Sequence, residues 1–164
     1  MDIPTPLELH RAAVLPEWID YNGHMNVAYY VLAFDHATDA FLDYIGLDAA
    51  HKARHACSTF VVDMNVTYRR EVVEGDALLF RTRLLDFDSK RMLTYHEMHH
   101  AASGYLAATN EILQVHVDME TRRVSPIAPS VLGRLEALHQ AHRTLPPPDN
   151  AGRVIRLRRT SGSG

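Results

Sequence analysis

Residues 18–27, WIDYNGHMNV, gather a carboxylate, an imidazole and two amides into one short segment ahead of an apolar helical pattern. Asp20 lies seven residues before Val27, the first position of that pattern. A helix N-terminus has free backbone N–H groups and a partial positive charge, so the Val27 amide can stabilise a developing oxyanion. A carboxylate in the preceding loop can attack a carbonyl there or activate a water. With Gly23 allowing a tight turn between them, the segment is organised like a small acyl-transfer site.

The same residues also have a plainer interpretation. Asp20 and Asn22 are common turn residues, and Asn26 is a common helix N-cap. His24, as a histidine in a loop, is typical of a hydrogen-bonded surface side chain. Spacing alone therefore leaves both a catalytic loop and an ordinary turn open.

A long amphipathic helix is predicted from Val27 onward. Its apolar positions recur at steps of three and four residues, and they are Tyr30, Val31, Phe34, Ala37, Phe41 and Ile45. Asn26 is the expected N-cap and Gly46 the expected stop. A helix of about 20 residues would be about 30 Å long.

Strand patterns surround this helix. We expect strands over residues 7–15, 59–68, 77–87, 91–100 and 105–119, and a short helix over 129–143. The long helix must bury its apolar face, and the only available partner is the sheet. The sequence therefore predicts an α+β fold in which an antiparallel sheet of five or six strands wraps one long central helix. Residues 1–145 form this domain, and residues 146–164 an extended basic tail.

Composition narrows the class of protein. The net charge is −3, which argues against nucleic-acid binding, and no apolar stretch is long enough to cross a membrane. Cys57 is the one cysteine, so a reducing, cytoplasmic setting is expected. The basic cluster near the end of the chain is either solvated or in contact with phosphate; it contains Arg153, Arg156, Arg158 and Arg159.

The runs DYNGHMN and VAYYVLAFDHATDAF resemble the start of hotdog-fold acyl-CoA thioesterases of the 4-hydroxybenzoyl-CoA thioesterase type. The runs VTYRREVVEGD, LLDFDSKRMLTYHEM and GYLAATNEILQVHVD are similar to the later strands of that family, so the resemblance covers about residues 8–143. It implies that Asp20 is the nucleophile or the general base and that the Val27 N–H is the oxyanion donor. It implies that Asn26 and His24 shape the loop and touch the thioester or the water. It also implies no metal, no cofactor, and a homodimer or homotetramer with active sites at subunit interfaces.

Some acidic residues depart from the family pattern. Certain members use a glutamate on the central helix, where this sequence has Asp35, and we interpret Asp35 as a surface or helix-stabilising residue. Glu71 and Glu111 remain alternatives for a second acid.

A finer resemblance concerns the acyl group. The runs PEWIDYNGHM, ATDAFLDYIGLDAA and HVDMETRRVSPIAP look like thioesterases of bacterial carnitine breakdown, which act on betainyl-CoA. A trimethylammonium group needs aromatic faces or carboxylates around it. The aromatic candidates are Tyr21, Tyr29, Tyr30, Phe34 and Tyr68, although such residues also suit a core. We expect Gly23, Tyr30, Phe34 and Tyr68 to contact the substrate.

The phosphates of coenzyme A would need basic partners, for which the candidates are Arg69, Arg70, Lys90 and Arg91; a solvated rim is the alternative for each. His96 and His100 share a face of one strand but would lie about 13 Å apart, too far to chelate one metal ion.

Two other functions remain open on this fold. One is an enoyl-CoA hydratase, which would need a paired aspartate and histidine, and the other is a non-catalytic acyl-CoA-binding protein.

Overall fold

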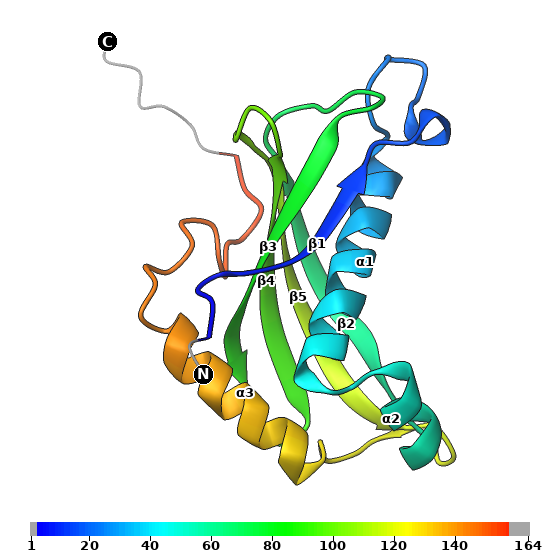
Figure 1. The fold of residues 1–164 in the computed structure, drawn as a ribbon, viewed down its shortest axis with the longest axis vertical. Coiled ribbons are helices and arrows are strands. Elements are labelled where there is room, and N and C mark those ends of the chain that lie inside the picture. The colour runs from blue at the N-terminus through cyan, green and yellow to red at the C-terminus, as the bar shows by residue number, and fades with distance from the viewer. Residues whose placement is uncertain (1–2, 158–164) are drawn as a thin grey trace.

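The computed structural model describes residues 3–157. In this part of the chain a curved sheet surrounds one long helix (Figure 1). Arg158, Arg159 and the final SGSG lie outside the described residues. The elements in chain order are β1 Leu7–Ala13, η1 Pro16–Trp18, α1 Val27–Ile45, α2 Ala49–His55, β2 Cys57–Tyr68, β3 Ala77–Phe87, β4 Arg91–His100, β5 Leu106–Asp118, β6 Arg123–Val124 and α3 Pro129–His142.

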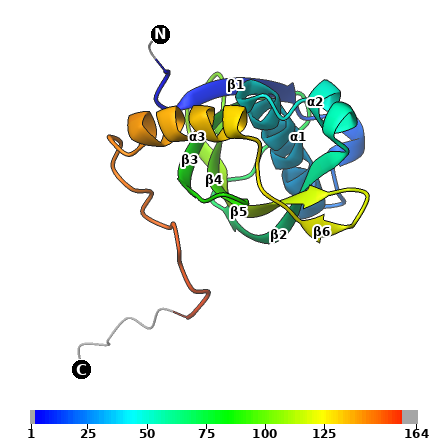
Figure 2. The ribbon, with the colours of Figure 1, turned by 90° about the horizontal axis from the view of Figure 1, so that it is seen from below.

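The sheet is antiparallel and runs in the order β1-β3-β4-β5-β2, and the short β6 adds to β5, which makes six strands within the described part of the chain. Figure 2 shows the sheet curling around α1, with α3 beside β3. This arrangement confirms the predicted α+β hotdog architecture. Strand β2 lies at one edge of the sheet, and β1 lies at the other.

Helix α1 begins and ends where the sequence predicts. The Asn26 side chain accepts a hydrogen bond from the Ala28 N–H at its start, and Gly46 adopts the left-handed conformation, with φ of 87°, at its end. The helix buries one stripe of side chains against the concave face of the sheet, and these are Tyr30, Ala33, Phe34, Ala37, Thr38, Phe41, Leu42 and Ile45.

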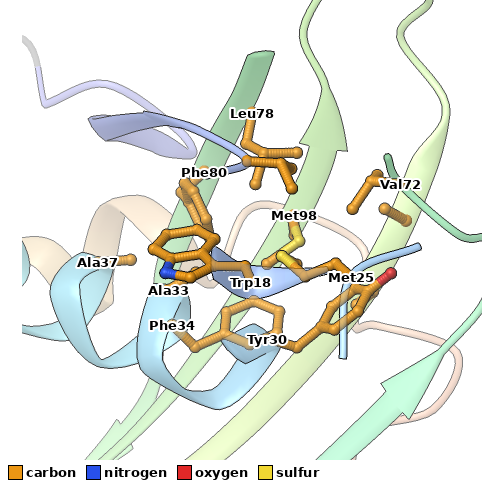
Figure 3. Close-up of a cluster of buried hydrophobic side chains, with 13 residues drawn as sticks. Trp18, Met25, Tyr30, Ala33, Phe34, Ala37, Val72, Leu78, Phe80 and Met98 are labelled. Carbon is orange, nitrogen blue, oxygen red and sulfur yellow. The ribbon is translucent and has the colours of Figure 1, made fainter. Parts of the chain in front are cut away.

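Two apolar clusters hold α1 in place. The first surrounds its N-terminal half and joins Trp18 and Met25 to Phe34, Phe80 and Met98 (Figure 3). Trp18 and Met25 belong to residues 18–26, which lead into α1 and are called the opening loop below. The second surrounds its C-terminal half and includes residues of β1, β3 and α3. The opening loop is therefore attached to the core at the same end of the sheet as the start of α1.

Several predicted boundaries need correction. The first strand ends at Ala13 rather than at residue 15, because Pro16 begins the short helix η1. Helix α2 was not predicted, and none of its residues is buried. The predicted alternation along β2 is also interrupted, because a register shift between Val61 and Asp63 places Phe60 opposite Val115 and Met64 opposite Ile112. Directly opposed residues share a face, so Phe60 and Met64 lie on opposite faces of the sheet.

The chain after α3 has no helix or strand through residue 157. Within the described residues, none of the helices is both long and apolar enough to span a membrane.

Candidate functional site

Two buried side chains anchor the opening loop. Trp18 and Met25 both lie in the cluster of Figure 3, where Met25 is almost fully buried. The Met25 N–H donates to the Val72 carbonyl at 2.9 Å, and the Asn26 N–H donates to the Trp18 carbonyl at 2.9 Å. Residues 20–24 are thus held at the surface between two fixed points.

Asp20 closes a tight turn within this loop. Its Oδ1 accepts the Asn22 N–H at 2.8 Å, and its backbone carbonyl accepts the Gly23 N–H at 3.0 Å. Gly23 has a φ of 84°, a conformation that other residues rarely adopt. The turn therefore fixes the Asp20 carboxylate with one oxygen already hydrogen-bonded.

Asn26 connects that carboxylate to the helix. Its Oδ1 accepts the Ala28 N–H at 2.9 Å, and its Nδ2 donates to Asp20 Oδ2 at 3.4 Å. One side chain therefore caps α1 and orients the other oxygen of Asp20.

The N–H of Val27 has no hydrogen-bond acceptor within residues 3–157, and the residue is 60% exposed. It points from the positive end of α1, where an oxyanion would be stabilised. A free N–H donor and an oriented carboxylate, bridged by Asn26, are the two groups that hydrolysis of an ester or thioester requires.

His24 does not pair with the Asp20 side chain; only its backbone carbonyl contacts Asp20, accepting the Asp20 N–H at 3.2 Å. The His24 ring instead lies near Glu71, with Nε2 and Oε2 3.6 Å apart. The structure thus places Glu71 beside the loop, a pairing that sequence spacing could not reveal. An aspartate–histidine pair of the hydratase kind is not formed by these two side chains.

Aromatic side chains flank the start of α1. The Tyr68 hydroxyl donates to the Val27 carbonyl at 3.2 Å, and its ring meets the Tyr30 ring edge to face, with centroids 5.1 Å apart. Burial raises the pKa of both phenols, so both stay protonated at neutral pH. Tyr68 is half-exposed, whereas Tyr30 is buried.

Phe34 requires a correction. It was expected among the substrate contacts, but it is fully buried between Phe80 and His96 in the core. Its spacing on α1 matched the core stripe and the expected acyl pocket equally well, so sequence could not separate the two roles.

The predicted basic residues do not form one group within the chain. Arg69 and Arg70 follow β2 at the end of the sheet near the opening loop, where both N–H groups donate to Ala107. Lys90 and Arg91 lie at the opposite end, where the Lys90 carbonyl accepts the His116 N–H. Residues 107 and 116 on β5 are about 30 Å apart at 3.3 Å per residue.

The remaining titratable candidates have structural partners or are exposed. Asp35 is exposed on α1, and Glu111 accepts the Gly152 N–H at 2.8 Å. His96 is buried, with its ring nitrogens 3.1 Å from Thr38 Oγ1 and 2.8 Å from Thr82 Oγ1. Between residues 3 and 157, no three histidine, cysteine or acidic side chains are placed to hold one metal ion.

Comparison with known proteins identifies the family of the chain. Residues 14–135 match the family described as the thioesterase-like superfamily. Betainyl-CoA thioesterase from Pseudomonas aeruginosa is 41% identical over 151 residues, which are 92% of this chain and 95% of that protein. The L-carnitine dehydrogenase/betainyl-CoA thioesterase of Agrobacterium fabrum is 39% identical over 95% of this chain, which spans only 32% of that longer protein.

Solved structures give the same picture of the fold. A candidate thioesterase from Pseudomonas putida superposes with a TM-score of 0.82 at 32% identity, covering 96% of this chain and 100% of that one. A Staphylococcus aureus protein solved in complex with CoA has a TM-score of 0.87 at 24% identity, covering 96% of this chain and 100% of that one. At that identity the second match shows the fold alone.

Proposed function

Because the chain belongs to the thioesterase-like superfamily, we propose that Asp20 and the Val27 amide hydrolyse betainyl-CoA to betaine and free CoA. That the chain is an acyl-CoA thioesterase follows from its family and from its 41% identity to a thioesterase over 92% of its length. The observation that supports the site is the Asn26 bridge, which holds the Asp20 carboxylate next to a free N–H at the start of α1.

The chemistry follows from these two groups. The Val27 N–H donates to the thioester oxygen and stabilises the negative charge that develops there. Asp20 acts in one of two ways. As nucleophile it forms an acyl anhydride, expels CoA thiolate, and is released by water. As general base it takes a proton from the water that attacks the carbonyl. Both routes give a carboxylic acid and CoA, and neither needs a metal or a cofactor.

The betainyl group carries a fixed positive charge next to the thioester. Tyr68 is held next to the Val27 backbone by its hydroxyl group and is half-exposed, so a trimethylammonium group can meet its ring face. Glu71 adds a carboxylate at the edge of the loop. Tyr21 is 98% exposed, and Tyr29 stacks on Trp18, so neither contributes a comparable pocket.

We also propose that the working unit is a homo-oligomer in the cytoplasm. The edge strand β2 carries exposed apolar side chains on both of its faces, namely Phe60, Val61, Val62, Met64 and Tyr68. Pairing of β2 with a second copy would satisfy the free strand edge and bring a partner next to these side chains. Tyr68 belongs to β2, so the site of the acyl group would then lie at the subunit interface. The unpaired Cys57 thiol suits a reducing compartment.

Thiol release from a panel of acyl-CoAs tests the proposal. The panel contains betainyl-, acetyl-, benzoyl- and long-chain acyl-CoA, and each is assayed with wild type, Asp20→Asn and Asp35→Asn. We expect Asp20→Asn to lower turnover by roughly 10²–10⁴. Asp35→Asn, which alters an exposed carboxylate on α1, should leave turnover unchanged. Full activity in Asp20→Asn would refute the mechanism, and binding of CoA esters without thiol release would favour a non-catalytic acyl-CoA-binding protein.

Two further measurements divide the remaining alternatives. Tyr68→Leu should raise the KM for betainyl-CoA more than the KM for acetyl-CoA, because only the former presents a cation to the ring. A single turnover in ¹⁸O-water that places label in Asp20 would identify the carboxylate as the nucleophile, because the general-base route labels only the product acid.

A further inference from the structure

A cavity lies on the convex face of the sheet, opposite α1. It has a volume of about 350 Å³ and is lined by Arg69, Arg81, Arg83 and Tyr95 of the sheet and by the segment 145–150. His96 and Thr82, which alternate with these residues along β4 and β3, face α1 instead. The cavity therefore belongs to a surface that the catalytic loop does not use.

The floor of this cavity is rich in guanidinium groups. Arg81 Nε donates to Glu8 at 2.9 Å, and Arg83 Nη1 donates to the Pro146 carbonyl at 2.7 Å. The side chain of Arg69 has no hydrogen-bond or ion-pair partner within the described residues. The carboxylates of the lining are Glu97 and Asp149, and Glu8 pairs with Arg81, so the guanidinium donors that stay free in the cavity are those of Arg69.

Glu97 is occupied by its neighbours. His99 Nε2 lies 3.0 Å from Glu97 Oε2, and Arg83 Nη2 lies 3.8 Å from Glu97 Oε1. These contacts hold the pKa of Glu97 below its usual value, with the hydrogen bond from His99 as the main cause. Because Glu97 faces His99 and Arg83, and Glu8 pairs with Arg81, Arg69 is left without a counter-ion among the described residues.

The roof is a proline-rich segment attached to the sheet through Pro146 and Asn150. Pro146, Pro147 and Pro148 cross above the arginines. Asn150 then contacts the sheet, where its Nδ2 donates to Thr67 Oγ1 at 3.1 Å and to Thr109 Oγ1 at 2.9 Å. Its Oδ1 accepts the Tyr95 hydroxyl. The roof is therefore held by three hydroxyl groups of β2, β4 and β5, so the cavity is already formed in the free protein.

We propose that this cavity binds a phosphate group, and that the nucleotide end of coenzyme A supplies it. Guanidinium groups match the geometry of phosphate oxygens, and Arg69 has its donors free. The size of the cavity suits a small anionic group. The assignment to coenzyme A rests on the proposed function, whereas binding of a free phosphate would rest on the cavity alone.

The cavity is connected to the catalytic loop by a short segment. Arg69 lines the cavity, and Val72, three residues further on, accepts the Met25 N–H of the opening loop. Three residues of extended chain span at most about 11 Å. A ligand whose phosphate lies at Arg69 can therefore extend around the end of the sheet toward Val27.

Calorimetric titration of the full chain with CoA, dephospho-CoA and inorganic phosphate tests the proposal. The variants are Arg69→Gln and Arg81→Gln in the floor and Asn150→Ala in the roof. The control is Arg123→Gln, which alters an exposed arginine on β6 at the far end of the sheet. We expect each cavity variant to weaken CoA binding by roughly tenfold, and the control to bind as wild type does. The KM for the acyl-CoA should rise by a similar factor in Arg69→Gln with kcat unchanged.

The outcomes separate the sources of the phosphate and the two proposals. Weaker binding of dephospho-CoA in wild type would identify the 3′-phosphate as the bound group, and equal binding would identify the diphosphate. Arginine-dependent binding of inorganic phosphate without binding of CoA would support the cavity with a free anion as ligand. CoA binding and KM that are unchanged in all three cavity variants would overturn the inference even if thiol is released. If wild type binds phosphate in the cavity but releases no thiol from any acyl-CoA, the proposed function alone would be overturned.

Discussion

His96 makes the stability of this protein depend on pH in a calculable way. The ring is fully buried under α1, between the hydroxyl groups of Thr38 and Thr82. Burial lowers its pKa from 6.5 to about 3. The unfolded chain therefore takes up a proton near pH 6.5, and the folded chain does so only near pH 3. Stability from this residue is fully present above pH 6.5 and is lost as the pH falls toward 3.

The size of the effect follows from the two pKa values. Each pH unit between them costs about 1.4 kcal/mol, so lowering the pH from 8 to 4.5 should remove about 2.7 kcal/mol from the free energy of unfolding. Burial also lowers the pKa of His10, His116 and His142, and these groups add to the dependence in the same direction. A comparison with a His96 variant isolates the contribution of this one ring.

Urea unfolding at pH 8 and pH 4.5, at one fixed protein concentration, measures the effect in wild type and in His96→Gln. Glutamine keeps hydrogen-bonding capacity between the two threonines but does not titrate. We expect the variant to be less stable at pH 8 and to lose about 2.7 kcal/mol less than wild type on acidification. The same loss in both proteins would refute the buried, neutral state of His96.

Three further predictions concern the loop and the core. Asn26→Ala should cost about 1 kcal/mol in the free energy of unfolding by chemical denaturation, whereas Asn26→Asp should keep the cap but lose turnover because it sets a second carboxylate beside Asp20; equal turnover in wild type and Asn26→Asp would contradict the bridge. Gly23→Ala meets no steric contact but must adopt a φ of 84°, so we expect a loss of about 1–2 kcal/mol and reduced kcat, and a fully stable variant would show that the turn can relax. Phe34→Ala should cost about 3–5 kcal/mol by thermal or urea unfolding, and a loss near zero would argue against its place in the core.

Local signals in the sequence predicted the elements that depend on local interactions. Asn26 and Gly46 mark both ends of α1 because a cap and a left-handed stop act within one turn of the helix. Helix α2 lacks an apolar stripe, and its one clear signal was Asp48, whose side chain accepts the His51 N–H at 2.7 Å. The register shift at Val61 depends on the partner strand β5, so no local pattern could reveal it.

In the candidate site, too, local features were predictable from the sequence and contacts with distant parts of the chain were not. Asp20 and Val27 were predicted because both lie in one short segment. The Asp20–Asn26 hydrogen bond follows from the loop path, which the Met25–Val72 contact fixes from a distant part of the chain. Likewise, the sequence offered Lys90 and Arg91 beside Arg69 and Arg70 as partners for the phosphates of coenzyme A. The hairpin between β3 and β4 places Lys90 and Arg91 at the other end of the sheet. The contacts of Asn150 depend on the tail returning across the sheet, and no signal in its polar sequence indicated this.

The exposed edge of β2 also has a consequence for how the chain must be produced in the cell. In the proposed oligomer, every newly made protomer would present an unpaired strand bearing Phe60 and Val62 until it meets a second copy. Such an edge can also pair with other extended chains. This pairing competes with assembly, and it becomes more frequent as unfolded chains accumulate. Asp63, exposed at the register shift, places a charge and a kink within this strand and so disfavours indiscriminate pairing. Replacing this aspartate with a β-branched residue should therefore increase aggregation during overexpression, while the activity of the folded protein that is recovered stays the same.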